Sequence, residues 1–180
     1  MLTEFVRDQT FTVAWFGLMA FVWLGWSQED PPPSWRKWLG LGSALGVALA
    51  LGFGFLTARH WSDGTALDGR YHWFGVLVAV EVAAAGAGSA VLARRNAGRW
   101  TAWWVALVVA LHFLPLAALL DDASIAVFGV LQCAGLLLLV GSLRRGDVTT
   151  SRHAGPLMGT SLLAYAAVSA ALVALDGTAF

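Results

Sequence analysis

Residues 71–120 decide the fold, and they read YHWFGVLVAVEVAAAGAGSAVLARRNAGRWTAWWVALVVALHFLPLAALL. Two apolar runs, Tyr71–Ala93 and Trp100–Leu120, flank the short polar break RRNAGR. Each run has the ~20 residues that a helix needs to cross a hydrocarbon layer of about 30 Å. Lipid offers backbone amides no hydrogen-bond partner, and the runs lack the alternating polar residues of a barrel strand, so each is predicted to be a transmembrane helix. The break allows only a turn, which makes the two helices antiparallel neighbours.

The same pattern recurs on both sides of this stretch. Four further apolar runs are separated by short polar segments: Phe11–Trp26, Trp38–Ala58, Ala123–Leu143 and Ala154–Leu175. The chain of 180 residues is 58% hydrophobic and 12% charged. Its mean hydropathy of +0.70 is too high for a water-soluble domain. We therefore predict an all-α integral membrane bundle of six transmembrane helices, which forms a single transmembrane domain over residues 1–180.

The distribution of charge predicts an orientation, because lysine and arginine in short loops stay on the cytoplasmic side of a membrane. Eight such side chains fall in the first, third and fifth connections and three elsewhere: Arg36, Lys37, Arg94, Arg95, Arg99, Arg144, Arg145 and Arg152, against Arg7, Arg59 and Arg70. Both termini are thus expected outside, in the inner membrane of a bacterium. The 11 basic and 11 acidic side chains balance, so no basic surplus exists that would track a nucleic-acid backbone, and nucleic acid is excluded as a main partner.

Glu81 is the one acid inside the apolar runs. A charged group in the hydrocarbon region costs about 2.5–3.5 kcal/mol on insertion scales, so it is a functional hypothesis by default. At 1.5 Å per residue, Glu81 lies ~13 Å below His72 at the outer edge. His112, in the next run, lies ~13 Å below Asp121 at the same edge. An acid and an imidazole from neighbouring helices are therefore expected at equal depth.

Polar side chains of the last two runs are predicted to join this layer. Gln132 lies ~15 Å below Asp122, and Tyr165 lies ~16 Å below Asp176. Ser161, Tyr165 and Ser169 are spaced by four residues and share one helix face. Because lipid offers these groups no partner, the faces that carry them are expected to point inward.

This layer predicts a pocket open to the outside for a small ligand, a cation or a proton. In this interpretation Glu81 holds the proton or cation, His112 sets the affinity through pH, and Gln132 and Tyr165 orient the ligand. Such a chain would be a binding or transport protein. In one alternative the polar groups serve only helix packing in a structural or accessory subunit. In another, Glu81 and His112 act as acid and base in an intramembrane enzyme on a lipid-like substrate, although no nucleophile or metal triad is evident.

No catalytic residue, metal ligand or cofactor is predicted. The outer loops carry metal-compatible side chains, but their spacing matches no specific motif: His60, Asp63, Asp68, His72, Asp121 and Asp122. Haem ligation would need two histidines at one depth, which the pattern does not provide. Cys133 is the single cysteine and is expected to be a packing residue.

Small residues at intervals of four predict close helix contacts. Gly42 and Gly46 form a GxxxG pair, and Ala84 and Gly88 repeat the spacing in the next run. The sequence leaves open whether these contacts form within one chain or in a homodimer. Membrane lipids are the remaining expected partner.

The segment Leu111–Ala117, LHFLPLA, follows a run with an intramembrane acid. This combination resembles a pattern in small multi-pass bacterial membrane proteins of uncharacterised function, and the resemblance implies no activity. The compact six-span outline is also similar to that of the substrate-binding membrane subunits of vitamin importers, without a shared motif.

Overall fold

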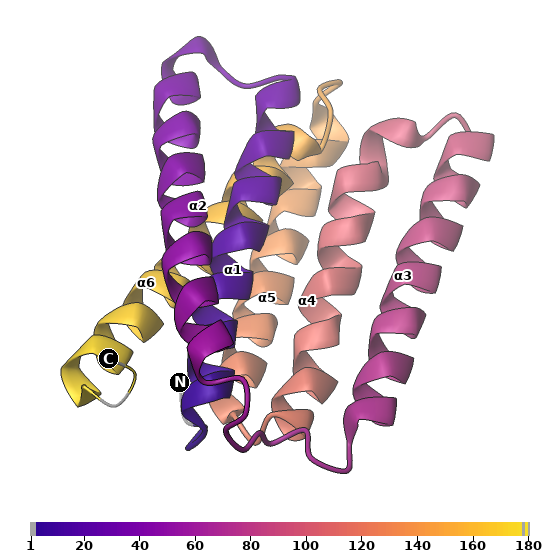
Figure 1. Ribbon diagram of the computed structural model, residues 1–180. Coiled ribbons are helices and arrows are strands. Elements are labelled where there is room, and N and C mark those ends of the chain that lie inside the picture. The colour runs from indigo at the N-terminus through magenta and orange to yellow at the C-terminus, as the bar shows by residue number, and fades with distance from the viewer. Residues whose placement is uncertain (1–2, 178, 180) are drawn as a thin grey trace.

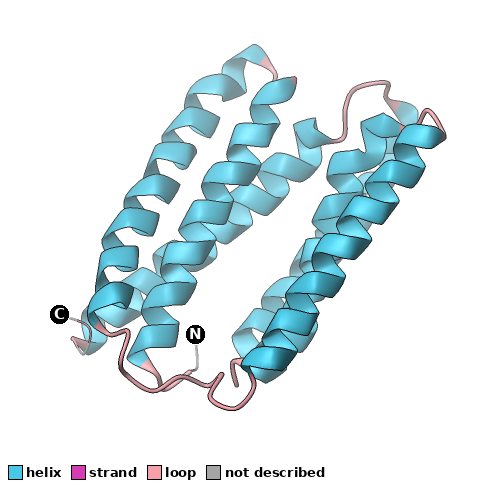
Figure 2. Cartoon of the chain, turned by 45° about the vertical axis from the view of Figure 1, so that its right-hand side comes forward, coloured by secondary structure: helices cyan, strands magenta, loops and turns pink. Residues whose placement is uncertain are grey.

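The computed structural model describes residues 3–177 and 179 and is built from helices (Figure 1, Figure 2). The long helices are α1 (Val6–Trp26), α2 (Arg36–Arg59), α3 (Tyr71–Arg94), α4 (Thr101–Leu119), α5 (Ala123–Arg145) and α6 (Ser151–Asp176). Short 3-10 turns lie in the connections: η1 (Ser27–Glu29), η2 (Pro33–Trp35) and η3 (Gly98–Trp100). Within the described residues there is no strand, and six helices are long and apolar enough to cross a membrane. The prediction of an all-α fold with six such helices is confirmed.

The helix bounds follow the predicted spans closely, except at the start of α1. This helix begins at Val6 rather than at Phe11, because the charge of Asp8 does not interrupt it. Asp8 is only 6% exposed. Its carboxylate accepts hydrogen bonds of 2.7 Å from the Thr65 hydroxyl and of 2.7 Å from the backbone N–H of Ala66. A carboxylate with such partners tolerates burial, so the helix extends more than a turn beyond the apolar run.

Successive helices run in opposite directions, so both termini lie at the same end of the bundle (Figure 1). We call this end, with connections 60–70 and 120–122, the terminal face, and the other end the opposite face. In Figure 1, α5, α4 and α3 stand in order toward one edge, while α6 slants behind α1 and α2. α1 packs most extensively against α2 and α6, and α4 against α5 and α3. α3 stands at the edge, and none of its residues, all of which the structure describes, is fully buried.

The glycines of α2 allow close contact with α1. A Cβ atom at Gly46 would lie 2.6 Å from the carbonyl oxygen of Gly17, and one at Gly17 would lie 2.8 Å from that of Gly46. A Cβ atom at Gly42 would lie 2.7 Å from a methyl carbon of Leu24. The GxxxG pair is therefore occupied by a contact within the chain, and it gives no support to a homodimer.

The small residues of α3 accommodate a side chain of α4. The Trp104 indole N–H donates a hydrogen bond of 3.1 Å to the carbonyl of Ala84. A Cβ atom at Gly88 would lie 2.0 Å from the same indole nitrogen. This spacing also serves packing within the chain, and it holds α3 against α4.

An aromatic cluster from four helices forms the centre of the bundle. Its members are Phe16 of α1, Phe113 of α4, Phe128 of α5 and Tyr165 of α6. The rings of Phe16 and Phe113 are 5.3 Å apart between centroids, and those of Phe128 and Tyr165 are 5.0 Å apart. Phe16 also contacts Phe128 and Tyr165, at 5.6 and 5.1 Å. The cluster fills the middle of the bundle with apolar surface, which separates the polar groups on either side of it.

Candidate ligand-binding site

A cavity of about 380 Å³ lies between α1, α3, α4 and connection 60–70. Its lining is formed by Arg7, Asp8, Phe11, Thr12, Trp15, Phe16, Trp61, Thr65, Leu67, Tyr71, Phe74, Val78, Glu81, His112, Leu116 and Leu120. Residues of connection 60–70 take part, so the cavity lies in the half of the bundle next to the terminal face.

Glu81 of α3 and His112 of α4 meet in this cavity. The structure places His112 Nδ1 3.1 Å from Glu81 Oε2, and the two side chains are 8% and 22% exposed. The contact is a close approach rather than a hydrogen bond, since Nδ1 has no aligned hydrogen-bond partner among the described residues. The tight turn between the helices, with Asn96 at φ 54°, makes α3 and α4 antiparallel. The two side chains thus lie at the equal depth that residue counting predicts.

Arg7 and Asp8 at the start of α1 form the end of the cavity next to the terminal face. The Arg7 guanidinium donates hydrogen bonds to the Tyr71 hydroxyl at 2.6 Å and to the Trp61 carbonyl at 3.1 Å. It also lies 4.4 Å from the centroid of the Trp61 ring. Asp8 is held by Thr65 and by the backbone of connection 60–70. The pair therefore fastens this connection over the cavity.

Sequence reasoning missed both residues because they precede the apolar run. The sequence does contain a signal for them. Asp8 and Thr12 are four residues apart, as are Phe11 and Trp15, so α1 carries a polar stripe beside an aromatic stripe.

The charge of the cavity depends on Glu81 and His112. Arg7 and Asp8 carry opposite charges, so the lining has a net negative charge only when Glu81 is ionised and His112 is neutral. Arg7 bonds Tyr71, which lies ten residues before Glu81 on α3, so about 15 Å of helix separates the guanidinium from the carboxylate. The deep part of the cavity is therefore negative when Glu81 is ionised and His112 is neutral.

The remaining wall is aromatic and aliphatic. Six of the described lining residues are aromatic: Phe11, Trp15, Phe16, Trp61, Tyr71 and Phe74. Phe11 and Trp15 stack with ring centroids 6.1 Å apart. Leucines and Val78 complete this wall. The site thus combines the Glu81 carboxylate with many ring faces, which is the chemistry that holds cations.

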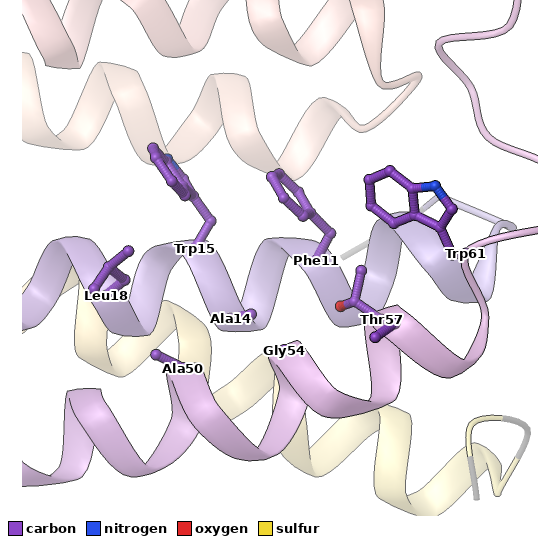
Figure 3. Close-up of a pocket in the computed structure, with 9 residues that line it drawn as sticks. Phe11, Ala14, Trp15, Leu18, Ala50, Gly54, Thr57 and Trp61 are labelled. Atoms are coloured by element: carbon purple, nitrogen blue, oxygen red, sulfur yellow. The ribbon is translucent and has the colours of Figure 1, made fainter.

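A shallower groove of about 280 Å³ lies between α1 and α2 and shares part of this wall (Figure 3). Phe11 and Trp15 project from one side of α1, and Trp61 stands beside them (Figure 3). All three residues line both the groove and the cavity. They are 44%, 47% and 61% exposed, so this aromatic row forms the partition between the cavity and the outer surface.

The other predicted site residues lie elsewhere. Gln132 Nε2 donates a hydrogen bond of 2.8 Å to the Ser161 hydroxyl, and the Tyr165 hydroxyl lies 2.6 Å from that of Ser124. Ser169 is buried in α6, at 2% exposure. None of Gln132, Ser161, Tyr165 and Ser169 is among the described residues that line the cavity. The expected single polar layer is therefore divided into the Glu81–His112 pair and an α5–α6 group.

The polar layer is divided because its side chains point in different directions from their helices. Residue counting gives the depth of a side chain in a helix but not the neighbour that its face meets. The polar face of α5 meets α6, and Phe16, which lines the cavity, packs against the ring of Tyr165. The ligand-binding role of the α5–α6 residues stays a prediction, and the cavity does not contain them.

The outer polar side chains form pairs rather than a cluster. His60 Nδ1 lies 2.7 Å from Asp63 Oδ2, and Arg70 Nη2 lies 2.9 Å from Asp121 Oδ2. Across residues 3–177 and 179, no group of three or more His, Cys, Asp and Glu side chains lies close enough to hold a metal ion.

Comparisons with models of protein families, with curated proteins and with solved structures found no match to this chain. Its function is therefore inferred from the chemistry of the cavity.

Proposed function

We propose that the six helices cross the inner membrane of a bacterium as one transmembrane domain, with the terminal face outside. Eight of the 11 basic side chains lie in connections or helix ends of the opposite face, as the positive-inside tendency requires of a cytoplasmic surface. In this orientation the cavity lies in the outer half of the bundle. Membrane lipids then cover the exposed apolar side of α3.

We propose further that the protein binds a small cation or a proton in this cavity and exchanges one for the other across the membrane. The observation that carries this proposal is the contact of Glu81 with His112 inside a cavity of about 380 Å³. An acid that is partly buried between helices, as Glu81 is, is costly unless its charge is used or matched. Here the available match is an imidazole, whose charge depends on protonation.

Competition between protons and the cation provides the mechanism. The charged and titratable groups of the lining are Arg7, Asp8, Tyr71, Glu81 and His112. Arg7 and Asp8 offset each other, so an ionised Glu81 beside a neutral His112 leaves a single negative charge for a cation. A proton on either member of the pair removes that charge. Proton uptake therefore releases the cation, and cation binding releases a proton, as linkage requires.

The Glu81→Gln variant tests this mechanism in liposomes that contain a pH-sensitive dye. Gradients of Na⁺, K⁺ and benzyltrimethylammonium are imposed in turn, and the rate of internal pH change is measured. At least one gradient should drive proton movement through the parent protein. The variant keeps the size of the side chain but loses the titratable charge, so its rate should fall by about tenfold or more, toward that of empty liposomes.

Glu4→Gln is the matched control, because Glu4 is exposed and lies outside the described lining of the cavity. It should retain the parent rate. Parent-like flux in Glu81→Gln, or no proton movement under any of the gradients, would contradict the proposed function.

The α5–α6 group favours a second candidate, an accessory membrane subunit. The part-buried hydrogen bond between Gln132 of α5 and Ser161 of α6 supports this candidate, because it joins two helices through a polar pair. If the Glu81–His112 pair also served only helix packing, the protein would act through a partner protein. That partner could be a second copy of the same chain, in a homodimer. The flux experiment separates the two candidates, since a packing pair gives no Glu81-dependent movement of protons.

A further inference from the structure

We infer that the cation is organic, with an apolar body of about the size of one aromatic ring carrying an amine or quaternary ammonium group. This inference rests on the proposed function and specifies its substrate class. It comes from what the cavity offers a cation besides the Glu81 carboxylate.

An inorganic cation would find too few oxygen ligands. Calcium ions take about six to eight oxygen ligands, and magnesium ions keep several waters that themselves need polar partners. The Thr65 hydroxyl donates to the Asp8 carboxylate, and the Thr12 hydroxyl donates to the Asp8 backbone carbonyl at 2.8 Å. The Asp8 carboxylate is itself engaged by connection 60–70. Glu81 is left as the one carboxylate of the described lining that accepts no hydrogen bond, and one carboxylate supplies at most two of the oxygen ligands that such an ion needs.

An organic cation needs no such ligand shell. Ammonium groups within about 6 Å of a ring centroid are attracted to the ring face, and the attraction grows when water is excluded. Trp15 lies nine residues into α1 and Glu81 ten residues into α3, so both lie roughly 14–15 Å from the terminal-face ends of their helices. A carboxylate and an indole at one level suit the charged end of such a ligand.

The size and polarity of the cavity suit the apolar body. Of the 16 described lining residues, ten are aromatic or aliphatic. A volume of about 380 Å³ lies within the ~300–1,000 Å³ range of small-molecule sites. On α3 the residues that precede Glu81 on the same face are Val78 and Phe74. The charge therefore lies at the end of a hydrophobic wall, as an amphiphilic ligand requires.

The aromatic partition gives such a ligand a route from the bilayer. Phe11, Trp15 and Trp61 line both the cavity and the groove between α1 and α2 (Figure 3). A ligand with an apolar body dissolves in the lipid that covers this groove. Rotation of these exposed side chains would admit the ligand to the cavity. A hydrated metal ion does not dissolve in lipid and so could not enter by this route.

Calorimetric titration of the protein in lipid nanodiscs tests the inference with two probes of equal shape. Benzyltrimethylammonium carries a charge, and neopentylbenzene is its neutral carbon isostere. The parent protein should bind the cation at least about tenfold more tightly than the isostere. Glu81→Gln should remove this preference, and Glu81→Asp, which keeps the charge, should retain it. Trp15→Leu should weaken binding of the cation several-fold and lower its preference over the isostere without abolishing it, because the Glu81 charge stays in place.

The outcomes distinguish this inference from the function on which it rests. If Na⁺ or K⁺ gradients drive Glu81-dependent proton movement but the protein does not bind benzyltrimethylammonium, the substrate class is wrong and the proposed function stands. Equal affinity for the cation and its isostere also overturns the inference, since the cavity would then recognise shape alone. Should Glu81→Gln fail to fold, a loss of preference in Glu81→Asp would count against the inference in its place.

Discussion

Gln132 is the largest polar side chain that the bundle buries almost completely, at 2% exposure. Its amide N–H₂ donates to Ser161, whereas its Oε1 has no hydrogen-bond partner among the described residues. Ser161 in turn donates a hydrogen bond of 3.0 Å to the carbonyl of Met158. Loss of the Ser161 hydroxyl leaves the Gln132 amide as a buried donor without a partner, which lowers the free energy of unfolding. Replacement of Gln132 by an apolar side chain of similar shape leaves no such donor, because Ser161 still donates to Met158.

Two substitutions in this pair should therefore differ in their effect on stability. Ser161→Ala should lower the free energy of unfolding by ~1 kcal/mol, because the Gln132 amide loses its acceptor. Gln132→Leu should be nearer to neutral, since it removes both the donor and the acceptor that already lacks a partner. Denaturation curves in mixed micelles measure both effects.

Neither variant should alter cation binding, because the pair lies outside the cavity lining. A large loss of binding in Ser161→Ala would show that the α5–α6 group belongs to the ligand site after all.

Side-chain depth was predictable from the sequence, and side-chain direction was not. Counting from the span ends put Glu81 and His112 at one level, and they are 3.1 Å apart. The same counting placed Tyr165 and Gln132 at nearly one level. In the structure their partners Ser124 and Ser161 lie on different elements, and the long tyrosine side chain reaches toward the terminal face. Direction depends on which helix a polar face meets, and this emerges only when all the helices pack.

At the scale of the helix, α2 shows how glycine sets a helix separation. Gly46 meets the backbone of α1, while Gly52 on the same helix has no atom within 4 Å of a Cβ built on it. One glycine is thus needed for close approach and the other is not. The two positions form a natural pair for comparison.

Gly46→Ala should destabilise the protein by about 1–3 kcal/mol, because its Cβ would lie 2.6 Å from the Gly17 carbonyl oxygen and would push α1 and α2 apart. Gly52→Ala should be neutral or slightly stabilising, since alanine favours the helix and meets nothing. Thermal unfolding of the two variants against the parent gives the comparison. Equal stability of the two variants would mean that the contact between α1 and α2 is looser than the structure shows.

The apolar runs predicted the elements well because uninterrupted runs of about 20 apolar residues are long enough for a membrane-crossing helix and too long for an ordinary strand. The turn at Asn96 was also predictable, since its left-handed conformation suits asparagine. The start of α1 was not, because Asp8 finds its partners in connection 60–70, far along the chain. Partners of this kind leave no local pattern, which is why the polar end of the cavity was missed.

At the scale of the whole molecule, the terminal face is tied together by polar contacts between connections. Arg70 pairs with Asp121 at 2.9 Å and so joins connection 60–70 to the turn between α4 and α5. Arg7 joins the same connection to α1. The cavity is thus covered at this face, and the aromatic row of Phe11, Trp15 and Trp61 separates it from the groove beside α2. In the proposed membrane orientation, this arrangement favours lateral access from lipid over access from water.

The orientation of the bundle can be tested with single cysteines in a Cys133→Ala background. Ser62 and Ser34 are both exposed serines, the first on the terminal face and the second on the opposite face. A membrane-impermeant maleimide added to intact bacterial cells should label Ser62→Cys within minutes, whereas Ser34→Cys should react only after the membrane is opened. The positive-inside tendency is the physical reason, because the basic side chains of the opposite face resist transfer across the membrane. The reverse pattern of labelling would place the cavity in the cytoplasmic half, and proton uptake at Glu81 would then occur from inside the cell.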